Sequence, residues 1–72
     1  MGEAEIDLKR LLGSIVHVFI KDGREIRGKL NVYDQYQNLI LENAEEYSDD
    51  KLMGKHRLIF VKGGNIKGIH SP

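Results

Sequence analysis

The chain has no cysteine, no tryptophan and one proline among its 72 residues. Without cysteine there are no disulfide bonds and no cysteine-based zinc sites. The three histidines, His17, His56 and His70, do not fall at metal-ligand spacings, so we predict no metal and no cofactor. The longest apolar run is only residues 58–61, and no segment is predicted to span a membrane. The acidic N-terminus does not resemble a signal peptide, and we predict a cytoplasmic location.

A chain this short is expected to form one domain, which we assign to residues 1–72. Domains of this size bury only about 60% of the surface that the extended chain exposes, so a monomer is marginally stable. Because disulfides and metals are excluded, association with further copies of the chain is the remaining way to stabilise it.

The net charge is zero, but the charges are unevenly distributed. Residues 1–50 hold eleven acids and six bases, whereas residues 51–72 hold five bases and no acid. Such a C-terminal segment can form a basic face for nucleic acid. On charge alone, a set of strands whose lysines are simply solvated is the more common arrangement.

The apolar pattern predicts a helix over about residues 4–12, which Gly13 ends. From residue 15 the period changes to two, which is typical of strands. Asp22 and Gly23 form a strong hairpin-turn signal. Gly28 lies in the middle of the next strand, where a glycine indicates a sharp bend or a close backbone approach.

Further strands are predicted from residue 39 towards 45, over residues 55–61 and over residues 66–69, with an acidic, solvated loop over residues 46–54. The fold class is therefore mostly β: an N-terminal helix followed by a small, strongly bent, five-stranded antiparallel barrel.

The candidate catalytic motifs lack residues or a rigid setting that catalysis requires, so we predict that the chain is not an enzyme. Residues 23–29 imitate a phosphate-binding loop, but Leu30 stands where a Ser or Thr must ligate magnesium. The carboxylate pairs lie in the acidic loop, where a general acid or base would be held poorly.

Two polar turns remain as candidate binding elements, residues 34–38 and residues 62–65. An aromatic side chain and a cation can sandwich a nucleobase, and an Asn can hydrogen-bond its edge. From the residues alone, structural roles are commoner than RNA binding: Asn38 would form the turn, and Tyr36 would be half-buried.

Residues 23–41 resemble the first motif of the Sm and Sm-like proteins, which has a glycine in the bent second strand, then an Asp, an aromatic residue or His, and an Asn at the turn. Residues 59–66 resemble the second motif. The motifs extend over about residues 15–46 and 55–70, and the resemblance covers roughly residues 6–71. It is strongest to the archaeal Sm-like proteins.

This resemblance implies a closed homo-oligomeric ring, most often a heptamer, that binds U-rich single-stranded RNA at its pore. Tyr36 would stack on a base, Asn38 would read its edge, and Asp34 would brace the turn. Lys62 would cover the other face of the base, and Gly63 would leave room for the backbone to contact the base. The family usually has Arg at the position of Lys62, whose ammonium stacks less well.

Tyr33 and Arg10 are candidates for a secondary RNA contact, in which Tyr33 would stack on a second base near Lys9 or Arg10. Packing of Tyr33 under the helix or at the subunit interface is the commoner role. The resemblance also implies a role in RNA processing or turnover, with RNA-processing proteins as further partners. The alternative is a scaffold ring that recruits proteins and binds RNA with little base specificity.

Overall fold

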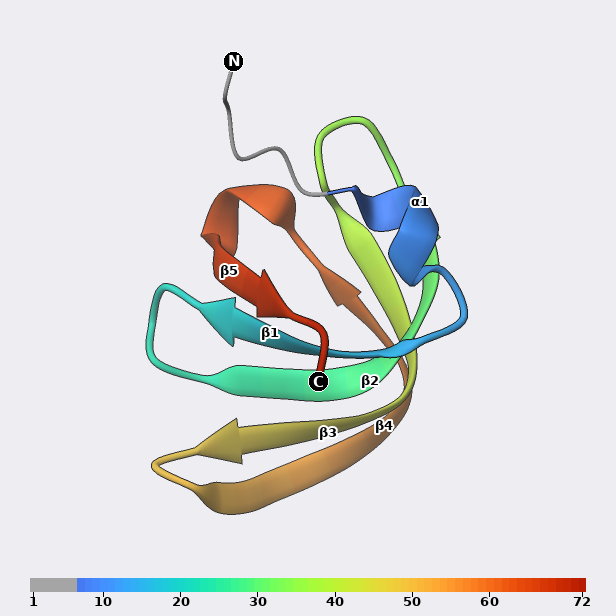
Figure 1. The fold of residues 1–72 in the computed structure, drawn as a ribbon. Helices are drawn as coiled ribbons and strands as arrows, with labels where there is room; N and C mark the ends of the chain where they lie inside the picture. The colour runs from blue at the N-terminus through green and yellow to red at the C-terminus, as the bar shows by residue number, and fades with distance from the viewer. Residues whose placement is uncertain (1–6) are drawn as a thin grey trace.

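In the computed structural model, which describes residues 7–72, five strands form one strongly curved antiparallel sheet that a short helix precedes (Figure 1). In chain order the elements are α1 (Leu8–Leu11), β1 (Ile15–Ile20), β2 (Glu25–Tyr33), β3 (Leu39–Ser48), β4 (Lys51–Val61), the 3₁₀ turn η1 (Gly63–Asn65) and β5 (Ile66–His70). The strand order is β4-β3-β2-β1-β5. This arrangement confirms the predicted fold class.

The core lies on the concave side of the sheet, where every second residue of β1 is buried (Val16, Val18 and Ile20). Leu8 of α1 is also buried and packs at one end of the barrel. The predicted helix began near residue 4, and its first residues lie outside the described part of the chain.

The pairing of β2 with β3 is irregular around Gly28, where the register shifts between Arg27 and Lys29. A side chain at Gly28 would lie 3.0 Å from both the Cα and the Cβ of Ala44 and 3.2 Å from the carbonyl oxygen of Glu42. On β3, Asn43 has a left-handed φ of 52°. The alternation of buried residues is interrupted there, because the buried residue after Leu41 is Ala44, three positions along the strand. The predicted close approach at Gly28 is therefore confirmed.

The predicted acidic loop over residues 46–54 is wrong, because these residues belong to a long hairpin. Strand β3 continues to Ser48 and β4 already begins at Lys51. Asp49 and Asp50 form the connection with φ of 52° and 64°, as a two-residue type I′ turn requires.

Charge pairing across strands explains why so acidic a segment remains ordered. Arg24 donates to Glu46 at 3.1 Å, and His56 lies 3.0 Å from the other oxygen of the same carboxylate. His56 and Arg24 together hold the pKa of Glu46 below its usual value. The Arg27 guanidinium also lies 4.2 Å from the centre of the Tyr47 ring.

Among residues 7–72, each of the two outer strands of the sheet, β4 and β5, has one edge that pairs with no other strand. Unpaired edges are ready to accept another strand. Large apolar side chains are exposed on β4: Leu52, Met53, Leu58 and Phe60.

Candidate functional site

The turn between β2 and β3 is organised around the carboxylate of Asp34. Its Oδ1 accepts hydrogen bonds from the backbone N–H groups of Tyr36 at 2.8 Å and Asn38 at 3.0 Å. Its Oδ2 accepts one from the Asn38 side-chain amide at 2.9 Å. These bonds hold the pKa of Asp34 below its usual value, and the bond from the Asn38 side chain contributes most. In the structure Asp34 thus braces this turn through three hydrogen bonds.

Asn38 joins this turn to the one that follows β4. Its Oδ1 accepts a hydrogen bond of 2.7 Å from the backbone N–H of Gly63. Leu39, which follows Asn38, is opposite Val61 in the sheet, and Val61 is the last residue of β4, two residues before Gly63. The two turns that the sequence singled out, 25 residues apart in the chain, therefore meet at one end of the β3–β4 ladder.

Gly63 is packed against the first turn. A Cβ at this position would overlap the carbonyl oxygen of Tyr36 and would lie 2.9 Å from the carbonyl carbon and oxygen of Gln37. The next residue, Gly64, has nothing within 4 Å of its own Cβ position. The absence of a side chain at residue 63 thus lets the two turns touch.

Tyr36 and Lys62 project from the joined turns with their side chains uncovered. Tyr36 is 71% exposed, and Lys62 is also exposed. Within residues 7–72, Lys62 forms no ion pair. An exposed ring and an unneutralised cation on two adjoining turns are suited to a planar ligand that carries negative charge.

A hollow next to the turn between β2 and β3 is lined by Tyr33, Lys9 and Gln37, among other residues. Tyr33 packs in part against the core. Arg10 instead pairs with Asp7 at 3.5 Å, with both side chains largely exposed. Of the two cations that the sequence placed near Tyr33, the structure brings Lys9 to it.

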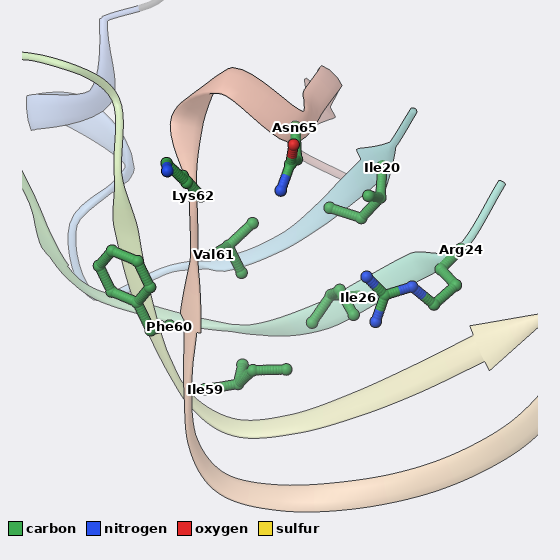
Figure 2. A pocket seen from close by; sticks show the side chains of 8 residues that line it. All are labelled: Ile20, Arg24, Ile26, Ile59, Phe60, Val61, Lys62 and Asn65. Atoms are coloured by element: carbon green, nitrogen blue, oxygen red, sulfur yellow. The ribbon is translucent and has the colours of Figure 1, made fainter. Parts of the chain in front are cut away.

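An apolar hollow of about 220 Å³ lies beside the C-terminal end of β4. Figure 2 shows Ile20, Ile26, Ile59 and Val61 pointing into it, with the Arg24 guanidinium at its rim. Arg24 is already paired with Asp22 and Glu46, so its charge is neutralised. Lys62 and Asn65 also border the hollow, so its apolar side chains suit an apolar occupant while the Lys62 ammonium remains at its edge. No pattern in the sequence predicted this hollow.

No group of three or more potential ligands suited to a metal ion occurs in the part of the chain that the structure describes. Over the same residues, none of the helices is long and apolar enough to cross a membrane.

Comparison with known proteins shows the family. Residues 6–71 match the family model of the LSM domain. An snRNP Sm-like protein of Methanosarcina acetivorans is 39% identical over 59 residues, which are 82% of each chain. One from Pyrococcus furiosus is 37% identical over 70 residues, with 96% of this chain and 92% of the relative covered.

Solved structures agree with these sequence matches. The Sm protein of Pyrococcus abyssi in complex with a uridine heptamer superposes with a TM-score of 0.87 at 32% identity, covering 94% of this chain and 100% of that one. The SmAP1 heptamer of Pyrobaculum aerophilum gives a TM-score of 0.83 at 38% identity, covering 90% and 86%.

Proposed function

This chain belongs to the LSM domain family, and we propose that it forms a homo-oligomeric ring that binds U-rich single-stranded RNA at the joined turns. Family membership agrees with the prediction that the chain is not an enzyme. The cellular role that we propose is support of RNA processing or turnover in the cytoplasm.

The observation that carries this proposal is the bond between Asn38 and Gly63, which holds the exposed Tyr36 and Lys62 on two adjoining turns. Stacking on an aromatic ring contributes about 1–3 kcal/mol per base. The cation attracts the phosphate or covers the second face of the base. The uridine heptamer bound by the similar Pyrococcus abyssi protein supports uracil as the base.

Asn38 retains the capacity to read a base although it already joins the turns. Its amide nitrogen gives one N–H to Asp34, and its oxygen accepts one bond from Gly63. One N–H and one lone pair remain, which suit a carbonyl and an imide N–H on a uracil edge. The same bonds fix which end of the amide faces each neighbour, so its orientation is set before RNA arrives. Tyr33 with Lys9 is proposed as a second contact, and Arg10 as a weaker one.

The proposed ring would pair β4 of one copy with β5 of the next. Two observations support it: both strands have a free edge, and Phe60, which is 63% exposed, lies on β4 beside the apolar hollow of Figure 2. A head-to-tail interface that closes on itself removes every free edge. A heptamer is the size that we propose, as in the similar Pyrobaculum aerophilum structure.

Tyr36→Ala tests the proposed function. We expect this change to weaken binding of a short oligo(U) by about 1–3 kcal/mol per bound base, because the stacking surface is lost. The Tyr36 side chain is exposed, so the fold should keep its melting temperature. Fluorescence anisotropy with a labelled oligo(U) measures the affinity, and Tyr36→Phe is the matched control that keeps the aromatic face.

Unchanged oligo(U) affinity in Tyr36→Ala would contradict the base pocket. A protein that still assembled into a ring would then fit the alternative function, a scaffold that recruits protein partners with little base-specific RNA binding.

Assembly is tested separately from RNA binding. We expect sedimentation at micromolar concentration to show one discrete species well above the monomer mass of 8.2 kDa, because a lone copy leaves both edges and the apolar hollow open. Phe60→Asp should shift this species towards smaller forms, since it places a charge where apolar surface is to be buried. A folded wild-type monomer at these concentrations would refute the ring.

A further inference from the structure

A hollow between the two hairpin ends, away from both joined turns, has an aromatic and acidic lining. The β1–β2 turn and the β3–β4 turn border it. It measures about 240 Å³ and is lined by Phe19, Gly23, Glu25, Tyr47, Asp49 and Asp50. None of these residues takes part in the proposed RNA site.

The strand register places two aromatic side chains on either side of a carboxylate. Glu25 of β2 is opposite Phe19 of β1, and on its other side it is opposite Tyr47 of β3. On the far side of Phe19 lies Gly68 of β5, which has no side chain to cover the ring. Phe19 is accordingly 38% exposed.

This surface already holds one guanidinium from its own chain. Arg27 lies 4.2 Å from the centre of the Tyr47 ring, and its Nε and one terminal nitrogen are 2.8 and 3.4 Å from the two oxygens of Glu25. Stacking on an aromatic face together with a carboxylate fork is how guanidinium groups are recognised. Tyr47 and Glu25 are engaged by Arg27, and Phe19, Asp49 and Asp50 offer the same two kinds of group, an aromatic face and carboxylates, to a second guanidinium.

The remaining carboxylates of the hollow are not neutralised. Neither Asp49 nor Asp50 forms an ion pair within residues 7–72, and no cation is among the lining residues. A phosphate backbone would be repelled here, whereas a cationic side chain would be attracted. The charge therefore excludes RNA as the occupant and favours a basic peptide.

We propose that this hollow binds arginine side chains of a basic segment in a partner protein, with Phe19 stacking on the guanidinium and Asp49 and Asp50 pairing with it. This site is separate from the RNA site, so RNA and a basic partner can be held at the same time on different surfaces.

The experiment uses the full chain and a fluorescent, amidated peptide of five Arg-Gly repeats. We expect Phe19→Ala to weaken its binding about two- to fivefold, the value of an exposed cation–π contact. Asp49→Asn combined with Asp50→Asn should weaken it about three- to tenfold. Asn tolerates the left-handed backbone at both positions, so the turn should be kept. A peptide of five Lys-Gly repeats should bind several-fold more weakly than the arginine peptide, because ammonium does not stack.

Asp7→Asn combined with Glu42→Gln is the matched control, because it removes the same charge elsewhere, and it should leave arginine-peptide binding within about twofold. The hollow variants should keep the melting temperature and oligo(U) affinity of the wild type, and the melting temperature reports an intact fold even if RNA binding itself is absent. Equal binding of the arginine and lysine peptides, or equal weakening by the control, would overturn the proposal. A changed sedimentation profile in the Asp49→Asn, Asp50→Asn protein would also overturn it, since another copy of the chain would then occupy the hollow.

Discussion

Gly63→Ala is expected to damage both the fold and RNA binding, although it adds only one methyl group. The new Cβ would overlap the carbonyl oxygen of Tyr36, which belongs to the backbone and cannot rotate away. The two turns must therefore separate. Overpacking of this kind costs about 1–3 kcal/mol, and the bond from the Gly63 N–H to Asn38 would be strained or lost with it.

Denaturant unfolding and oligo(U) anisotropy measure the two effects. We expect oligo(U) affinity to fall at least as far as in Tyr36→Ala, because Tyr36 and Lys62 move apart and Asn38 loses its orientation. Gly64→Ala is the matched control: its Cβ meets nothing within 4 Å, so stability and affinity should stay near the wild type. Equal behaviour of the two alanine variants would show that contact between the turns is unimportant.

The position of the candidate site could be predicted from the sequence because it depends on local signals. Asp34 and Asn38 lie four residues apart, and their mutual hydrogen bonds are formed within one turn. The contact with Gly63 could not be derived from that spacing, because it depends on the β3–β4 register. The family resemblance implied that Gly63 leaves room for the backbone to contact the base. In the structure its missing side chain leaves room for the backbone of Tyr36 and Gln37.

The hairpin beyond residue 45 could not be predicted for a related reason. A run with four acids among six residues is typical of a solvated loop when it is considered alone. Its order depends on partners elsewhere in the chain: Arg24, just before β2, and His56 on β4 both reach Glu46. Side chains that neutralise a segment from distant strands leave no local pattern.

The role of Gly28, by contrast, could be recognised from the sequence, because a glycine in the middle of a long strand usually marks a bend or a close backbone approach.

Gly28→Val is expected to cause a large loss of stability. A Cβ there meets the Cα and Cβ of Ala44 at 3.0 Å, in a part of the sheet where Ala44 is 1% exposed. Two further methyl groups have no free space, so we expect the free energy of unfolding to fall by about 1–3 kcal/mol or more. Gly54→Val is the matched control in β4, because its Cβ meets only the His56 ring at 3.9 Å.

A double-mutant cycle identifies the contact responsible. Gly28→Ala should cost less than Gly28→Val, and Ala44→Gly should cost about 0.5–1 kcal/mol or more for the added backbone freedom and the lost buried methyl. Because Ala44→Gly removes one of the two atoms at 3.0 Å from the new Cβ, the double variant should be more stable than the sum of the single changes predicts, as residues in contact couple by about 0.5–3 kcal/mol. Additive costs, or a Gly28→Val protein as stable as Gly54→Val, would place the bend of the barrel at a different residue.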